Sequence, residues 1–580
     1  MRLIEMRVRN FRTIKGGNVR ISFEGSDIIF LLGQNNAGKS TLLSAYELLI
    51  NPKHKPKIHD FYGHKASEPI IIEGLFRKEP GDDEAFADNG LDKWVDTDGL
   101  LKFKVEWTTP DQVGQKYTFE PAKQEYAKNG FGGLDTIFMH HAPTPIRIPA
   151  MPSMDELSKW ASDTFKTVAI KLMAEQEHDT YQQALEKVRA LEEAMLSQEH
   201  ISALVKRSNT HFCKVFPDIE LQVTPKDGQE FDLSKLFDKR FDLGVKDNRL
   251  PTLDQHITSQ GHGVIRLAMF NVLGLLKDLD GKTDKKAFLL LFEEPEIYLH
   301  PHKLHLLRRC LYELCADSPF QALCASHSPA LIDISRPHTS LVRIARDSNG
   351  ITRSYQIGED VFQSDDNRKQ HVQMVNRFNP HICEAFFADE VVLVEGDTET
   401  IVLRELLEKH ALERDIFVLN TGSKNNIPFF QEVLTHFRIK QHVLHDCDSK
   451  YLPAKEGGKP RKNSAWVLND SIWQWVVKAQ EIDTGLSRRY VFGRNFESAH
   501  DYVFDPDKGK PLSAYEFARA LTLNDSGQPV INFLLQILNN KGRECEFTPE
   551  DLLDILEKTE KTQISMTMIS TNSESTETSA

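Results

Sequence analysis

Apolar and polar positions alternate along the first part of the chain in the patterns of strands and of one helix. Residues 2–9 alternate, residues 27–32 form a short apolar run, and residues 39–50 carry leucines at helical spacing. A period of two predicts strands, and a spacing of three to four residues predicts a helix. Further short strands are predicted at 70–76, 102–107 and 117–119.

Strands and helices alternate again in two later cycles. The first is predicted to contain a helix at 263–277, a strand at 288–292, a helix at 303–315 and a strand at 321–325. The second is predicted to contain strands at 391–395, 416–420 and 442–446, with helices at 398–409 and 425–436. Such alternation predicts an α/β protein with two parallel sheets in series, and we place the boundary between residues 345 and 390.

A stretch between the first strands and the first later cycle has a different composition. Residues 155–215 lack proline and are rich in Ala, Leu, Glu, Lys and Gln, which predicts two or more long helices. They could form a dimerisation arm or a solvated helical subdomain. We therefore expect five segments, with a disordered Ser/Thr-rich tail as the last: 1–150, 151–220, 221–360, 380–558 and 559–580.

Composition narrows the functional class. The chain has 580 residues, a net charge of −14 and a sequence pI near 5.9, which excludes a wholly basic protein that coats nucleic acid. A nucleic-acid enzyme is still possible, because it needs positive charge only along its groove. The sequence shows no apolar run of bilayer length and no signal-peptide core, so we expect a cytoplasmic protein with no membrane partner. The seven cysteines form no CxxC pair, so neither disulfides nor structural zinc are expected.

A phosphate-binding motif follows the second predicted strand. The segment FLLGQNNAGKST fits G-x-x-x-x-G-K-[ST] and lies between an apolar strand and a helical pattern. In such a loop backbone N–H groups surround the phosphates, the lysine reaches the terminal ones, and the serine hydroxyl holds Mg²⁺. We predict ATP binding by Gly33, Asn36, Gly38, Lys39, Ser40 and Thr41, with Ser40 also a magnesium ligand.

Two later strands end in residues that suit the same site. The apolar strand AFLLLF ends at Glu293 and Glu294, and we predict that the first serves the metal and the second polarises the attacking water. The next strand ends close to His327, which could contact the γ-phosphate. Paired glutamates and a single histidine are also common on solvated surfaces.

The second α/β cycle carries its own carboxylates. Glu395 follows one strand, Glu399 lies one helical turn later, and Asp446 and Asp448 follow a strand farther along the chain. Residues two apart on a strand face the same side, so these carboxylates can share one crevice at the carboxyl edge of the sheet. Several carboxylates in one crevice repel each other unless cations lie among them, so we predict two Mg²⁺ or Mn²⁺ ions bridging a phosphodiester. A solvated acidic loop is the alternative, and Cys447 is expected to be buried packing.

A basic segment follows these aspartates. Its cations are suited to a phosphate backbone, although an ordinary surface loop has the same composition. The residues are Lys455, Lys459, Arg461 and Lys462.

The motifs of the first cycle resemble the ATP-binding-cassette heads of the SMC/RecF group. The resemblance rests on NFRTI at 10–14, GQNNAGKST, SQGHG at 259–263, LLFEEPEIYLHP and ASHSP. It implies that Ser259, Gly261 and Gly263 form a signature loop that closes over the nucleotide of a partner subunit, although SQGHG departs from the usual LSGGQ. A homodimer or a larger homo-oligomer is therefore implied.

The pair EGDTE and DCD resembles the Toprim domain. An SMC/RecF-like ATPase followed by a Toprim domain is the arrangement of the OLD (overcoming lysogenization defect) family of ATP-dependent nucleases. This resemblance implies that Glu497 is a further metal ligand, that Lys541 offsets charge on the cleaved phosphate, and that NTGSKNN at 420–426 is the family's glycine-containing turn.

Together these features predict an ATP-dependent, metal-dependent DNA endonuclease or nickase in which the nucleotide state gates the Toprim site. The resemblance also implies bacterial anti-phage defence, with a helicase or a retron reverse transcriptase and its reverse-transcribed DNA as possible partners. An SMC/RecF-like ATPase that tethers DNA without cutting it is the rival, and primase or topoisomerase chemistry is a second alternative.

Overall fold

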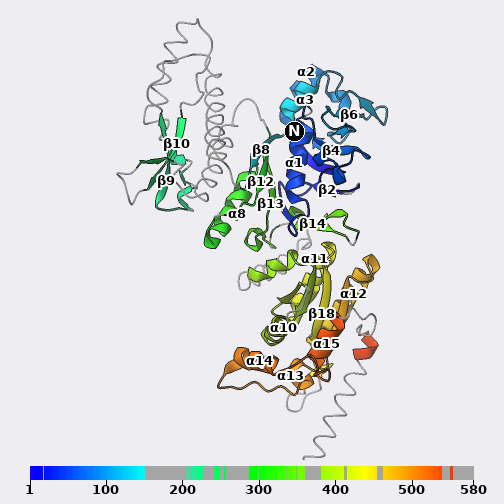
Figure 1. The fold of residues 1–580 in the computed structure, drawn as a ribbon, viewed down its shortest axis with the longest axis vertical. Coiled ribbons are helices and arrows are strands. Elements are labelled where there is room, and N and C mark those ends of the chain that lie inside the picture. Colours follow the sequence, from blue (N-terminus) through cyan, green and yellow to red (C-terminus); the bar gives the residue numbers. More distant parts are fainter. Residues whose placement is uncertain are drawn as a thin grey trace, which may run out of the picture. The chain divides into compact units, whose positions relative to one another are not determined.

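The chain folds into two compact units, Met1–Asp360 and Val361–Ala580. The computed structural model describes residues 1–150, parts of 205–256, 287–358, 380–410, 415–452, 461–538 and 549–552, apart from a few single residues within these ranges. Figure 1 shows the fold and labels many of the helices and strands.

A six-stranded sheet forms the centre of the first unit. Its strand order is β15-β14-β3-β13-β12-β8, parallel except for β15, which is antiparallel to β14. Every residue of β3 and β13 is buried, as is typical of parallel strands that are covered on both faces. The bounds are β3 Ile28–Leu32, β8 Thr144–Ile148, β12 Phe288–Glu293, β13 Phe320–Ala325, β14 Leu341–Arg346 and β15 Thr352–Gln356.

A second, antiparallel sheet packs with the first through helix α1 (Lys39–Ile50). Its order is β2-β1-β4-β5-β6-β7, and α1 contacts β4 of this sheet and β13 of the central one. Leu42, Leu43, Ala45 and Tyr46 of α1 are all fully buried, so the helix is apolar around most of its circumference and belongs to the common core. The bounds are β1 Arg2–Arg9, β2 Val19–Ser22, β4 Ile70–Arg77, β5 Leu100–Trp107, β6 Gln115–Glu120 and β7 Glu125–Lys128.

Helix α8 (Pro301–Cys315) packs against β3 and β13 of the central sheet. Pro301 takes the first helical position, where no backbone N–H is needed, and leucines three and four residues apart form its buried stripe. The unit also contains α2 Asp83–Asn89, α3 Asp135–His141 and a three-stranded antiparallel sheet of β9 Ile219–Pro225, β10 Phe241–Asp247 and β11 Asp254–His256.

The second unit is built on a four-stranded parallel sheet of order β17-β16-β18-β21. Helices α10, α14 and α15 share an apolar core with this sheet. Helices α11 and α12 contact each other, and α11 also contacts β18 while α12 contacts β21. The strands are β16 Glu390–Val394, β17 Ile416–Asn420, β18 Lys440–Asp446 and β21 Ser487–Phe492. The helices are α10 Asp397–Lys409, α11 Ile427–His436, α12 Ser464–Ile482, α13 Phe496–Ala499, α14 Gly509–Ala520 and α15 Pro529–Leu538. A hairpin of β19 Tyr451–Leu452 and β20 Arg461–Lys462 completes the unit.

The observed elements confirm the predicted α/β architecture with two parallel sheets. Each strand and helix predicted within the described residues is present, with ends that differ by three residues or fewer. The sequence analysis did not predict β8, β14 and β15, which extend the central sheet. The predicted helix at 263–277, most of the helical stretch 155–215 and the tail 559–580 lie outside the described residues. No helix in the described part of the chain is long and apolar enough to cross a membrane.

Candidate functional site

Two glycines shape the loop between β3 and α1. Gly33 has φ +136°, and a Cβ atom there would lie 2.1 Å from the carbonyl oxygen of Ile344 on β14. Gly38 has φ +109° and precedes the first residue of α1. Both conformations disfavour residues with a side chain, so the tight turn between β3 and α1 depends on glycine. Arg346 supports the loop from β14 by donating a hydrogen bond to the carbonyl oxygen of Asn36 (2.9 Å).

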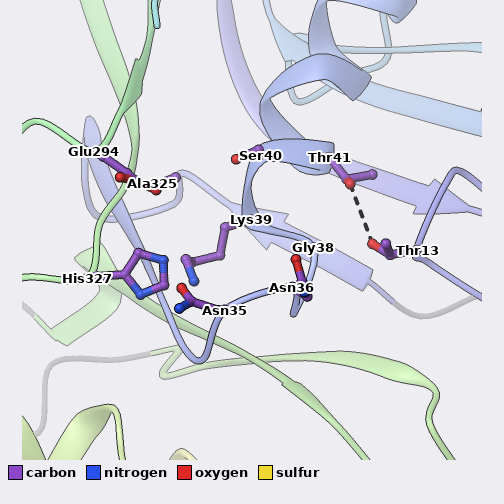
Figure 2. A pocket seen from close by; sticks show the side chains of 10 residues that line it. All are labelled: Thr13, Asn35, Asn36, Gly38, Lys39, Ser40, Thr41, Glu294, Ala325 and His327. Carbon is purple, nitrogen blue, oxygen red and sulfur yellow. Dashed lines mark hydrogen bonds between the residues drawn. The ribbon is translucent and has the colours of Figure 1, made fainter. Parts of the chain in front are cut away.

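The loop forms one wall of a cavity of about 250 Å³ (Figure 2). Seven of the predicted nucleotide-site residues line this cavity: Asn36, Gly38, Lys39, Ser40, Thr41, Glu294 and His327. The lining also includes Thr13, Asn35 and Ala325. Thr13 belongs to the NFRTI segment, and its hydroxyl oxygen lies 3.4 Å from that of Thr41. The cavity therefore brings together residues from four separate parts of the sequence.

Lys39 is held by its own loop. Its Nζ donates to the carbonyl oxygens of Gly33 (2.7 Å) and Gln34 (2.8 Å). Burial lowers the pKa of Lys39 to about 8, although the nearby carboxylates of Glu294 and Glu296 act in the opposite direction. Negatively charged phosphate oxygens beside Nζ would stabilise the charged form of this lysine.

The two glutamates at the end of β12 have different environments. Glu293 accepts a hydrogen bond from Arg147 of β8 (2.5 Å), which also pairs with Glu47 of α1 (3.1 Å), and Glu293 is not among the cavity-lining residues. Glu294 lines the cavity, has φ +43°, and donates its backbone N–H to the carbonyl oxygen of Ala325 (2.7 Å). Glu294 thus lines the cavity, whereas Glu293 is bound to Arg147.

Glu296 is a supporting residue that the sequence analysis did not single out. Its carboxylate accepts hydrogen bonds from the backbone N–H of His327 (2.6 Å) and from the hydroxyl of Ser326 (3.0 Å). This fixes the chain where β13 ends and presents the His327 ring to the cavity (Figure 2). Burial, followed by the charge of Lys39, lowers the pKa of His327, which favours the neutral imidazole. The signal in the sequence was the spacing of Glu296 two residues after Glu294.

The predicted signature-loop residues Ser259, Gly261 and Gly263 lie outside the described residues, and so does Lys541. Their roles stay predictions.

The carboxylates of the second unit meet at the carboxyl edge of its parallel sheet. Glu395 directly follows β16, and its carboxylate accepts the backbone N–H of Asp446 (2.8 Å), the last residue of β18. Burial, together with the charges of Glu395, Glu399, Asp448 and Glu497, raises the pKa of Asp446 to about 9. Burial likewise raises the pKa of Glu395 to about 7. The five predicted acidic residues therefore lie close enough to influence one another.

Lys424 lies among these carboxylates, and the sequence analysis did not assign it a role. Its Nζ donates to the carbonyl oxygen of Asp446 (2.6 Å) and to Oδ2 of Asp448 (2.6 Å), and the residue is only 4% exposed. The turn that carries it is fixed by two hydrogen bonds, from Thr421 to the carbonyl oxygen of Val394 and from Asn426 to that of Thr421. Its position in NTGSKNN was visible in the sequence, but its contact with the aspartates depends on how the turn folds.

The acidic crevice suits a divalent cation by its chemistry. Oδ1 of Asp446 is buried and has no hydrogen-bond partner within the described residues, and hard divalent ions prefer carboxylate oxygen ligands. In this conformation no three carboxylate, histidine or cysteine side chains of the described part converge on one ion position. One of the carboxylates of the crevice, that of Asp448, is bound to Lys424 in this conformation. Cys447 is fully buried, as predicted.

Two parts of the chain match known families. Residues 1–214 and 154–332 match the family described as "AAA ATPase domain", and residues 386–448 match "Overcoming lysogenization defect protein-like, TOPRIM domain". The first match covers more than half of the chain. Both agree with the predicted order of an ATPase followed by a second α/β domain.

Three similar proteins are named as nucleases or as an endonuclease. The Old nuclease of Escherichia phage P2 is 24% identical over 490 residues, which cover 77% of each chain. Endonuclease GajA of Bacillus cereus is 21% identical over 79% of this chain and 77% of its own. The OLD nuclease of Thermus scotoductus is 30% identical over 249 residues, 42% of this chain and 46% of that protein. Among solved structures, an SMC head bound to the C-terminal winged-helix domain of ScpA aligns with 63% of this chain at a TM-score of 0.41 and 10% identity.

Proposed function

This chain belongs to the AAA ATPase domain family and carries the TOPRIM domain of overcoming lysogenization defect (OLD) proteins, and on this premise we propose that it is an ATP-dependent DNA endonuclease or nickase. The observation that carries the proposal is the meeting of Glu395, Asp446 and Asp448 at the carboxyl edge of the parallel sheet. The similar relatives named as nucleases support it.

In the first unit, the cavity beside α1 is the proposed ATP site. Lys39 would donate to the terminal phosphates, Ser40 would bind Mg²⁺, and the backbone of the glycine loop would surround the phosphate chain. Glu294 would orient the attacking water, and His327 would donate a hydrogen bond to the γ-phosphate from its neutral ring. Glu296 would act through His327 by fixing its backbone.

In the second unit, the proposed ligands of Mg²⁺ or Mn²⁺ are Glu395, Glu399, Asp446, Asp448 and Glu497. Two such ions would supply a more acidic water and stabilise the charge on the attacked phosphate. The protein's own contribution is a set of closely spaced, mostly partly buried carboxylates, whose mutual repulsion bound cations would relieve. Lys424 balances part of that charge in the structure as it stands.

We also propose that nucleotide binding gates cleavage and that the protein acts as a homodimer, because a signature loop at 259–263 would complete the ATP site of a partner. A role in anti-phage defence follows only from the family resemblance.

The proposal is tested by incubating the purified protein with supercoiled plasmid, with and without Mg²⁺ or Mn²⁺ and with and without ATP. We expect metal-dependent nicking or linearisation that the variant Asp446→Ala loses while it still binds ATP. Lys39→Ala should weaken ATP binding measured by calorimetry. Full cleavage by Asp446→Ala would refute the second site, and unchanged ATP affinity of Lys39→Ala would refute the first. Plasmid binding by the wild type without cleavage in any metal would favour the DNA-tethering alternative.

A further inference from the structure

A hollow of about 440 Å³ lies beside the acidic crevice. Of the residues that line it, one is a proposed metal ligand. Asp448 forms part of its wall, and Tyr451, Leu452 and Arg494 line it farther along. The hollow is therefore continuous with a carboxylate proposed to hold metal. Its size falls in the range of small-molecule sites, about 300–1,000 Å³.

The walls of the hollow are fixed by hydrogen bonds to the backbone. Asn463 donates to the carbonyl oxygen of Ser449 (2.9 Å) and accepts from the backbone N–H of Ala465 (3.1 Å), which ties the β19–β20 hairpin to the start of α12. On the opposite side, the backbone N–H of Asp448 donates to the carbonyl oxygen of Arg494 (3.1 Å). The segments that carry Tyr451 and Arg494 are thus held beside Asp448.

Exposed basic side chains that form no ion pair with any described residue lie in and near the hollow. Arg494 is exposed and makes no ion pair with any described residue, and the same is true of the exposed Lys450, Arg461 and Lys462 on and beside the hairpin. In the hairpin, Tyr451 of β19 lies opposite Lys462 of β20, and Leu452 lies opposite Arg461. Each basic residue of β20 is therefore the cross-strand neighbour of a large apolar residue. Although the chain has a net charge of −14, this local positive charge favours an anionic ligand.

Apolar surface is exposed at the same place. Tyr451 is 50% exposed and Leu452 is 42% exposed, although both are large apolar side chains. An exposed aromatic ring flanked by arginine and lysine is the arrangement by which proteins bind single-stranded nucleic acid, with bases stacked on the ring and phosphates on the cations. The charge of Asp448 would oppose an anion, but Lys424 offsets it in the structure as it stands, and the proposed metal would do so during cleavage.

We propose that this hollow binds an unpaired nucleotide of the DNA strand next to the phosphodiester to be cut, with the base on Tyr451 and a phosphate on Arg494. This rests on the proposed function and adds a substrate class, because a base inside an intact duplex cannot stack on a side chain. DNA with single-stranded segments, flaps or easily opened steps is then preferred over closed duplex.

Binding is measured without divalent metal, so that it does not depend on cleavage. The probes are a short fluorescein-labelled single strand and the matching duplex, followed by fluorescence anisotropy with the full-length protein. Tyr451→Ala and Arg494→Ala should each weaken single-strand binding about tenfold and reduce the preference for single strand over duplex. Tyr451→Phe, which keeps the ring, should bind like the wild type. Tyr515→Ala is the matched control, because Tyr515 is an exposed tyrosine of α14 that lies beside Arg519.

The outcomes separate this inference from the proposed function. If the wild type cleaves plasmid but Tyr451→Ala and Arg494→Ala bind single strand as tightly as the wild type, the subsite is wrong and the nuclease assignment stands. If the wild type binds single strand through Tyr451 but cuts no DNA in any metal, the subsite stands and the nuclease assignment fails. Loss of binding in Tyr515→Ala as well would also overturn the subsite. Circular dichroism confirms that each variant is folded.

Discussion

Lys424→Met removes the ammonium group from the acidic crevice while keeping an unbranched side chain of similar length. In the wild type the two hydrogen bonds of Nζ are both 2.6 Å long, the lysine side chain is 5% exposed and Asp448 is 30% exposed. Breaking a buried ion pair costs about 3–5 kcal/mol. Because Asp448 is partly solvated and the neighbouring carboxyls can take up protons, we expect a smaller loss of about 2–3 kcal/mol in the metal-free protein.

The loss is measurable by thermal unfolding. For a unit of this size about 1 kcal/mol shifts Tm by roughly 2–4 °C, so the unfolding transition of the second unit should fall by about 4–12 °C in EDTA. Mn²⁺ should narrow the difference, because a divalent ion replaces the missing positive charge in the crevice. Lys440→Met is the control, since Lys440 pairs with Glu390 at the other end of β18 (3.2 Å). Equal Tm values for Lys424→Met and the wild type in EDTA would show that Lys424 does not compensate the crevice.

Three further predictions follow from charge. The pKa of Lys39 is lowered to about 8, so the lysine loses the positive charge proposed to bind phosphate as the pH rises above that value. The ATP affinity of the wild type, measured by calorimetry, should therefore fall between pH 8 and pH 10. The weaker affinity of Lys39→Ala should not change over this range. The raised pKa values of Glu395, about 7, and Asp446, about 9, mean that the metal-free fold is favoured at low pH and loses stability as pH rises through these values. The free energy of unfolding from urea titrations in EDTA should therefore be lower at pH 9 than at pH 6, and a higher value at pH 9 would contradict the assignment. DNA affinity should fall steeply with salt, because an acidic chain can bind DNA only through local basic segments, and a salt-independent Kd would argue against phosphate contacts.

The sequence alone predicted the order of elements and most of the residues that meet at each site. Apolar runs such as β3 and β12 are continuous because both faces of a parallel sheet are covered, and this pattern is local. The glycine loop and the acidic residues after β16 and β18 could be placed because strands of a parallel sheet end at one edge.

The missed features depend on contacts between distant residues. Arg147 pairs with Glu293 across 146 positions of sequence, because β8 joins the sheet beside β12, and no local pattern signals that neighbour. The sequence around Lys424 is that of an ordinary turn, and its contact with Asp448 depends on how that turn folds. Burial also decides the pKa values of Asp446 and Glu395, and burial of a polar side chain cannot be read from its own position in the chain.

The bond from Arg346 to Asn36 has a mechanical consequence. It joins the tip of the phosphate loop to β14, and the hydroxyl of Thr352 on β15 bonds the carbonyl oxygen of Ala37 from the adjoining strand (3.5 Å). The loop thus rests on the last two strands of the first unit, immediately before the chain crosses into the second. The strand pair that holds the phosphate loop is thus also the last pair of strands in sequence before the residues that join the two units.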